Sequence, residues 1–196
     1  MILGITGSVG TGKSSVAAYF QALGAELINA DTVAHSVIKS GTPGYKKIVS
    51  LFGKRALSSS GAIDRKRLGK IVFEDSRLLN KLNSIVHPEV ITVVKNRIRK
   101  SRSKMIIFDA PLLIEAGLIN LVDELIVVRV SRPVQIQRLR CKTGLSSAQI
   151  IARIKAQMPL SAKIKMADFV IDNNGTKIKT KKQVVSIWKQ LTKGDK

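Results

Sequence analysis

The chain of 196 residues is long enough for one domain with a substantial interior, or for one core with insertions. Its hydrophobic content of 44% indicates a globular protein and excludes a disordered one. No apolar run approaches the roughly 20 residues of a membrane-spanning helix, the first residues do not resemble a signal peptide, and a single cysteine excludes a disulfide framework. We therefore expect a cytoplasmic protein without a membrane anchor.

The chain is strongly basic, with 34 Lys and Arg against 13 Asp and Glu and a net charge of +21. Such a balance favours anionic partners, which leaves two interpretations: a nucleic-acid binder, or an enzyme with phosphorylated substrates. Aromatic residues make up only 4%, too few for a base-stacking platform. We expect neither a nucleic-acid partner nor an obligate protein partner.

The first elements frame a phosphate-binding motif. Residues 1–6 are apolar and predict a short buried strand, and residues 15–23 carry apolar side chains at helical spacing. Between them, residues 7–14 match the pattern G-x-x-x-x-G-K-[ST], for which strand, loop and helix in this order are the required context. A chance glycine-rich turn is the alternative, and the flanking elements argue against it.

The motif has a physical rationale for binding a nucleoside triphosphate. Its glycines let the backbone N–H groups point inward, and the helix N-terminus adds partial positive charge. Lys13 reaches the β- and γ-phosphates, and the Ser14 hydroxyl is a ligand for Mg²⁺. The candidate ATP-binding residues here are Gly7, Ser8, Val9, Gly10, Thr11, Gly12, Lys13, Ser14 and Ser15.

Asp31 follows a predicted second strand at residues 25–29. Ligands of parallel α/β sheets bind beyond the carboxyl ends of the strands, so we expect Asp31 to face the phosphate loop in a catalytic role. The alternative is that Asp31 caps a helix over residues 32–38.

Residues 31–103 are predicted to be a helical insertion that can hold a second substrate. Breaks at residues 41–44 and 58–61 separate helical patterns, and His87-Pro88 is predicted to start a new helix that runs to about residue 102.

A third buried strand at residues 105–108 ends in Asp109. An acidic residue in this position after a phosphate loop holds Mg²⁺ directly or through water, although an Asp before Pro111 also suits a simple turn. Residues 125–130 are β-branched and apolar, and predict a fourth strand.

Residues 131–162 form a basic helical hairpin in this prediction. One helix covers residues 133–140, and a capping box of Ser146 and Gln149 opens a second one. Its Arg and Lys residues mark either a solvated face or a mobile lid over the nucleotide. After the hairpin we expect a fifth strand at residues 169–171, a turn and a last helix, which together give an α/β fold with a parallel sheet.

Taken together, these motifs resemble the dephospho-CoA kinase family over almost the whole chain. Beyond the phosphate loop, the resemblance rests on the blocks 29–35, 87–88, 109–115 and 168–175, with Arg138 and residues 153–157. It implies a single P-loop kinase domain over residues 1–196, with a five-stranded parallel sheet flanked by helices. Its parts would be a nucleotide core (1–30, 104–131 and 162–196), a helical CoA-binding part (31–103) and a lid (132–161).

The resemblance also implies an activity, in which ATP phosphorylates the ribose 3′-hydroxyl of dephospho-CoA in the last step of coenzyme A synthesis. Asp31 would accept the hydroxyl proton, and Lys13 with the loop amides would hold the ATP phosphates. Ser14 and Asp109 would bind Mg²⁺. The further candidates are Arg138, Arg140, Asn174 and Gly175 for ATP, and His87, Pro111 and Leu112 for the acceptor.

Two departures from the family pattern concern these roles. Asn29 stands where the family usually has the first Asp of Asp-Ala-Asp, and Lys142-Thr143 stands where many members have Arg-Asp. A lysine offers no bidentate fork, so the phosphate contact at Lys142 passes to Arg140 in one interpretation. Two other functions stay open: a kinase for another small acceptor, such as a nucleoside monophosphate, and an NTP-dependent nucleic-acid binder.

Overall fold

The computed structural model describes residues 1–193, apart from the side chains of residues 73 and 74. The chain divides into two compact units. The first contains residues 1–29 and the chain from residue 101 onward, and the second contains residues 30–100.

The first unit is built on a parallel sheet of five strands, as predicted. In the order β2-β3-β1-β4-β5, the first strand lies in the middle of the sheet, between β3 and β4. In such sheets ligands bind beyond the carboxyl end of the strand where the order reverses, which here is β1. The strands are β1 (Ile2–Thr6), β2 (Glu26–Asn29), β3 (Ile106–Asp109), β4 (Glu124–Arg129) and β5 (Phe169–Asp172).

Helices α1 (Lys13–Ala22) and α9 (Lys177–Thr192) pack together on the sheet and bury its main core. This core contains Leu3 and Ile5 of β1, Phe20 of α1 and Val184 of α9, all fully buried. The apolar residues recur at the periods of strands and helices, so the sequence pattern predicts which face of each element is buried, and the topology of the sheet determines which faces meet.

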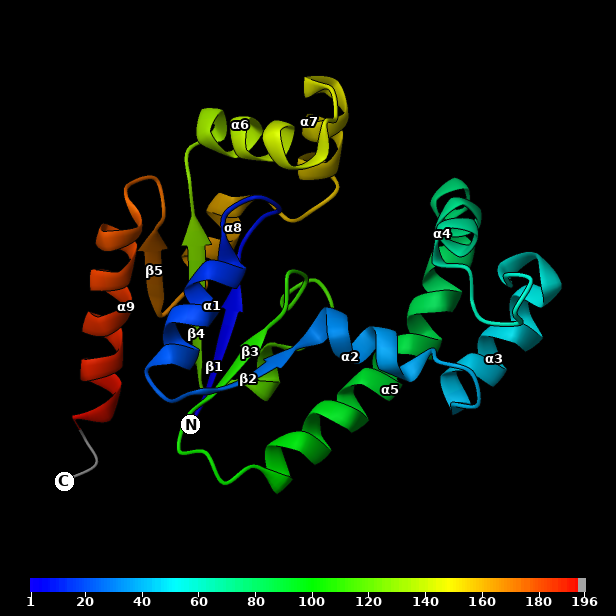
Figure 1. Cartoon of the computed structure of the whole chain (residues 1–196), viewed down its shortest axis with the longest axis horizontal. Helices are drawn as coiled ribbons and strands as arrows, with labels where there is room; N and C mark the ends of the chain where they lie inside the picture. The colour runs from blue at the N-terminus through cyan, green and yellow to red at the C-terminus, as the bar shows by residue number, and fades with distance from the viewer. Residues whose placement is uncertain (194–196) are drawn as a thin grey trace. The chain divides into compact units, whose positions relative to one another are not determined.

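Helices α6 (Arg132–Thr143) and α7 (Ser147–Lys155) form the predicted hairpin, at the carboxyl end of the strands (Figure 1). The capping box is confirmed, since Ser146 accepts from Gln149 N at 3.3 Å and Gln149 Oε1 accepts from Ser146 N at 3.0 Å. A short helix α8 (Leu160–Lys165), absent from the prediction, follows the hairpin, and a 3-10 turn η2 (Ile119–Leu121) precedes β4.

The second unit is helical within its described residues, as predicted. Its elements are α2 (Ala30–Val37), α3 (Pro43–Phe52), a 3-10 turn η1 (Gly53–Ala56), α4 (Arg65–Glu74) and α5 (Ser76–Lys100). Ile48, Phe52 and Leu68 lie in its core.

One local prediction for this unit is wrong. Pro88 does not start a helix but lies inside α5, which runs without a break from Ser76 to Lys100. Residues on both sides of the proline, such as Val86 and Val90, are partly or fully buried, and this packing outweighs the missing backbone N–H. The alternative interpretation of Asp31 as an N-cap does not hold, because α2 begins one residue earlier, at Ala30.

Candidate active site

The phosphate loop adopts a conformation that depends on its glycines, as Gly10 and Gly12 illustrate. Gly10 and Gly12 have φ angles of 79° and 88°, in the left-handed region that other residues avoid. A Cβ on Gly12 would also collide with the side-chain amide of Asn173, and one on Gly10 would lie 2.7 Å from Leu139 Cγ. The loop therefore depends on both glycines for its path and for its close contact with neighbouring segments.

Lys13 begins α1 and lies folded over the loop. The residue is 9% exposed, and its Nζ donates to the carbonyl oxygens of Gly7 at 3.2 Å and Ser8 at 3.3 Å. Ser14 and Ser15 are exposed at the N-terminus of the same helix, where backbone N–H groups and the helix dipole favour an anion. The Lys13 ammonium group, backbone amides and two hydroxyls therefore lie together at the N-terminal end of α1.

Asp109 ends β3 beside this loop. In the sheet register it is the partner of Ile5 in β1 and of Asn29 in β2, and Asn29 Nδ2 donates to Asp109 Oδ2 at 3.1 Å. Asp109 is 3% exposed. The asparagine that replaces the family's usual aspartate thus bonds to the carboxylate proposed to bind metal.

The chain after Asp109 is fixed by a buried lysine. Pro111 O accepts from Thr6 Oγ1 at 3.1 Å and from Lys163 Nζ at 2.9 Å. Lys163 is fully buried and forms an ion pair with Glu115 at 2.8 Å. Next to Pro111, Leu112 is 47% exposed, so its side chain is accessible to a ligand.

Asn173 connects the β5 turn, the hairpin and the phosphate loop. Its Nδ2 donates to Thr11 O at 2.8 Å, its Oδ1 accepts from Thr180 Oγ1 at 2.8 Å, and its carbonyl accepts from Arg138 Nη2 at 2.9 Å. The predicted ATP contact Arg138 is therefore held close to the loop, while Arg140 on the same helix is exposed. No sequence pattern predicted a role for Asn173.

The neighbouring turn residues lie at the surface. Asn174 and Gly175 are exposed, and Asn174 Oδ1 accepts from Ser131 N at 2.7 Å, which ties the β5 turn to the start of α6. Asp172 Oδ1 accepts from Asn174 N at 2.9 Å, and this hydrogen bond, with a further one from Arg129, lowers the pKa of Asp172.

Two glutamines that were not predicted as site residues bind the tip of the loop. Gln135 in α6 donates to Val9 O at 2.6 Å, and Gln157 Oε1, beyond α7, accepts from Val9 N at 2.8 Å. Gln157 lies in a stretch that carried the family resemblance, but neither glutamine has a sequence pattern that marks it.

Two candidate residues belong to the second unit. Asp31 is exposed in the first turn of α2, where a carboxylate interacts favourably with the helix dipole. His87 lies in the middle of α5, and burial lowers the pKa of its imidazole. The roles of both residues stay predictions.

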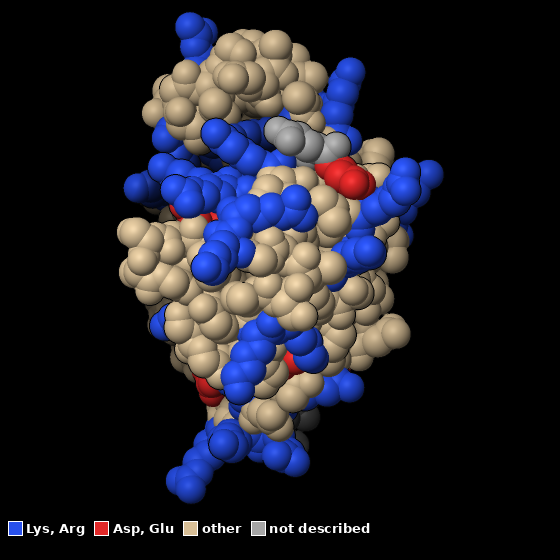
Figure 2. Space-filling model, turned by 90° about the vertical axis from the view of Figure 1, so that its right-hand side faces the viewer, with Lys and Arg blue, Asp and Glu red and all other residues tan. Residues whose placement is uncertain are grey.

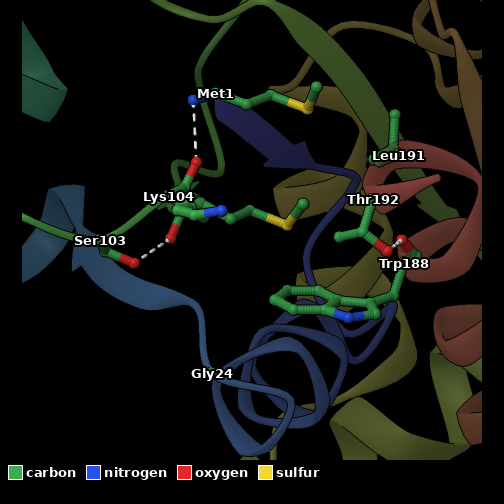
Figure 3. A pocket seen from close by; sticks show the side chains of 8 residues that line it. Met1, Gly24, Ser103, Lys104, Trp188, Leu191 and Thr192 are labelled. Carbon is green, nitrogen blue, oxygen red and sulfur yellow. Dashed lines mark hydrogen bonds between the residues drawn. The ribbon is translucent and has the colours of Figure 1, made fainter. Parts of the chain in front are cut away.

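A pocket of about 430 Å³ lies elsewhere in the first unit, where Trp188, Met1 and Lys104 surround it (Figure 3). Met1 and Met105 directly precede β1 and β3, so this pocket lies at the amino ends of the strands. It is therefore separate from the phosphate loop, which follows the carboxyl end of β1.

The basic residues do not form a single patch on the face that Figure 2 shows. Figure 2 shows lysine and arginine side chains in several separate groups on one face, with few acidic side chains among them. This distribution does not single out one nucleic-acid-binding surface on that face. Among residues 1–193, no helix combines the length and the apolar character needed to cross a bilayer.

A parallel sheet whose central strand runs into a glycine loop that ends in Lys13, beside a basic helical hairpin, is the architecture of a P-loop kinase. Solved structures agree with this class. The chain superimposes with a TM-score of 0.74 on a dephospho-CoA kinase from Campylobacter jejuni, at 28% identity over 100% of this chain and 98% of the other. A shikimate kinase from Bacteroides thetaiotaomicron shares the fold, with a TM-score of 0.56 and 13% identity over 97% and 98% of the two chains.

Sequence comparisons identify the family. The model of the dephospho-CoA kinase family matches residues 1–179. The dephospho-CoA kinases of Carboxydothermus hydrogenoformans and Geobacillus kaustophilus are 43% and 42% identical to this chain; the matches cover 98% and 97% of it, and 97% and 96% of those proteins. The chain belongs to the dephospho-CoA kinase family, whose members use ATP to phosphorylate dephospho-CoA to coenzyme A in the last step of its synthesis.

Proposed function

We propose that this chain transfers the γ-phosphoryl group of ATP to the ribose 3′-hydroxyl of dephospho-CoA, with Mg²⁺ and in the cytoplasm. One observation supports the proposal above all. The phosphate loop, with Lys13 folded over it and the N-terminus of α1 behind it, has the arrangement of groups that a triphosphate requires. ATP and dephospho-CoA are the substrates, and no obligate protein partner is proposed.

The loop and its lysine bind the ATP phosphates in this proposal. In the structure, Lys13 Nζ donates to two loop carbonyls. The charged oxygens of a triphosphate are stronger acceptors for the same Nζ. Arg138 and Arg140 of α6 add charge over the phosphates, and the Asn174-Gly175 turn lies near the adenine. Lys13 and the two arginines together neutralise the charge that spreads over the transferred group, which is the main requirement of phosphoryl transfer.

Ser14 and Asp109 are the proposed Mg²⁺ ligands. A hydroxyl and a carboxylate are hard oxygen donors of the kind that Mg²⁺ prefers. Among the described residues, no three Asp, Glu, His or Cys side chains come together as a metal site. This donor set fits Mg²⁺, which is usually held by one or two protein oxygens together with substrate phosphates and water. When bound, the ion supplies positive charge to the β- and γ-phosphates.

Asp31 is the proposed general base. It accepts the proton of the ribose 3′-hydroxyl as that oxygen forms its bond to the γ-phosphorus. The bond between the γ-phosphorus and its bridging oxygen breaks, and ADP leaves with the electron pair. His87, Pro111 and Leu112 are the proposed contacts of the acceptor.

A direct assay tests the proposal. Purified protein is incubated with ATP, Mg²⁺ and dephospho-CoA, and coenzyme A is quantified by mass spectrometry. Parallel reactions replace the acceptor by a nucleoside monophosphate or by RNA. ADP formation that depends on dephospho-CoA supports the proposal. ATP turnover stimulated by RNA and indifferent to dephospho-CoA would contradict it.

Two variants test the assigned roles in the same assay. Lys13→Ala removes charge from the transferred group, and Asp31→Asn removes the base, which typically contributes roughly 10²–10⁴-fold to the rate. We expect Lys13→Ala to lose more activity, and Asp31→Asn to lower kcat while ATP affinity stays close to that of the wild type. Full turnover by Asp31→Asn would exclude Asp31 as the base.

A further inference from the structure

The tip of the phosphate loop is held by side chains from both ends of the α6–α7 hairpin. Gln135 lies in the first turn of α6, and Gln157 lies two residues beyond α7. Gln135 Nε2 donates to Val9 O at 2.6 Å and to Ser8 Oγ at 2.9 Å. Gln157 Oε1 accepts from Ser8 Oγ at 3.0 Å and from Val9 N at 2.8 Å. Two consecutive loop residues are thus bonded between two amides.

The direction of these hydrogen bonds is fixed by their backbone partners. Val9 N–H can only donate, so Gln157 must present its oxygen to it. Val9 C=O can only accept, so Gln135 must present its nitrogen. The single hydroxyl hydrogen of Ser8 then goes to Gln157, because Ser8 Oγ already accepts from Gln135. Gln135 acts as a donor and Gln157 as an acceptor.

Burial and packing keep the Ser8 and Gln135 side of this arrangement away from water, while Gln157 is half-buried. Ser8 and Gln135 are 2% and 3% exposed. The Val9 side chain packs against the small core of the hairpin, which consists of Leu139, Ile150 and Ile154. A buried polar group that loses its partner costs more than the hydrogen bond itself contributes, so the tip of the loop has few alternative conformations.

We propose that Gln135 and Gln157 are positioning residues that hold the phosphate loop in its ATP-binding conformation before ATP arrives. They act through Ser8 and Val9, whose bonded groups face the hairpin, and not by contact with the substrate. When these hydrogen bonds are removed, the loop adopts its ATP-binding conformation for only a fraction of the time, and the apparent Kd for ATP rises in inverse proportion to that fraction. The inference rests on the proposed binding of ATP by this loop.

A matched pair of variants tests the proposal. Gln157→Glu and Gln135→Glu each add one negative charge beside the same Ser8 hydroxyl. A carboxylate at 157 still accepts from Val9 N and Ser8 Oγ, whereas a carboxylate at 135 faces the Val9 carbonyl and has no hydrogen to donate. We expect Gln135→Glu to bind ATP about tenfold more weakly than Gln157→Glu, and Gln157→Ala to bind it about tenfold more weakly than the wild type.

Isothermal titration calorimetry with ATP and Mg²⁺ measures these affinities, and the kinase assay at saturating ATP gives kcat, which we expect to change much less than the affinity. Gln149→Ala is the control, since this exposed glutamine of the same hairpin bonds to Ser146 in the capping box. Its ATP affinity should equal that of the wild type. If thermal melting shows that Gln135→Glu does not fold, Gln135→Met is used instead, because it removes the donor without adding a charge. We expect the same loss of ATP affinity from it.

Equal ATP affinities of the two glutamate variants would overturn the proposal, because charge alone would then explain them. Wild-type affinity in Gln157→Ala would overturn it as well. Because ATP binding is measured without an acceptor, this result does not depend on whether the wild type phosphorylates dephospho-CoA. Failure of the proposed function and failure of the positioning role are therefore separate outcomes.

Discussion

The ion pair between Lys163 and Glu115 allows a stability prediction with a calculable size. Lys163 is fully buried, and its Nζ lies 2.8 Å from Glu115 Oε1 and 2.9 Å from Pro111 O. Lys163→Met keeps most of the volume but removes the charge. The Glu115 side chain is 22% exposed and still accepts from Met158 N at 3.1 Å, so water and the backbone compensate part of the loss.

The cost of Lys163→Met should therefore fall between that of an exposed ion pair, about 0–1 kcal/mol, and that of breaking a buried one, about 3–5 kcal/mol. We expect about 2–3 kcal/mol, which in a chain of this size lowers Tm by roughly 4–12 °C. Urea unfolding followed by circular dichroism measures the free energy, and thermal melting measures Tm.

A double-mutant cycle with Glu115→Gln checks the reasoning. Each single variant leaves an ionic group with its partner removed, so the double variant should be more stable than the sum of the single losses predicts, with a coupling energy of about 1–3 kcal/mol. Additive losses, or a loss below about 1 kcal/mol for Lys163→Met, would refute the assignment of this pair as a stabilising contact.

Three further predictions concern residues in both units. Asn173→Ala removes two buried side-chain hydrogen bonds and should lower the free energy of unfolding in urea by about 1–3 kcal/mol, whereas Asn174→Ala, at an exposed position, should cost less. Burial lowers the pKa of His87, so the unfolded state binds the proton more tightly and stability falls as the pH drops through about 6.5. His87→Gln should remove that part of the pH dependence in melting curves, and an unchanged profile would exclude His87 as its source. Pro88→Ala restores a backbone N–H inside α5 and should raise the melting temperature, with a gain of about 1 kcal/mol or more, and a lower Tm would show that the proline is needed for the packing of this helix.

Much of the fold could be predicted because it depends on local patterns. Apolar runs identified all strands of the sheet, and the capping box at Ser146 fixed the start of α7 to the residue. The prediction failed where packing outweighs a local rule, as at Pro88. Helix α8 was missed because its six residues, Leu160–Lys165, are too few for a clear periodic pattern.

The candidate site was predictable only in part. The phosphate loop has a sequence signature because every residue of it acts within one short segment. Gln135, Gln157 and Asn173 bond to loop residues that are 126 to 162 positions away in the chain, so only the folded topology brings them there. An isolated amide side chain carries no pattern that indicates such a partner. The role of Asp31 and the single-domain organisation stay predictions.

These long-range contacts explain how a flexible glycine-rich segment serves an electrostatic function. Gln135 and Gln157 satisfy polar groups at the tip of the loop, and Asn173 satisfies the carbonyl of Thr11. Because side chains of the protein bond these groups, ATP does not have to order the loop when it binds. The contacts of ATP with the inward-facing amides and Lys13 then contribute to affinity without that cost. Catalysis of phosphoryl transfer depends on such preorganised charge. Changes at the three amides should therefore alter ATP affinity more than the KM for dephospho-CoA, although none of them is a proposed contact of either substrate.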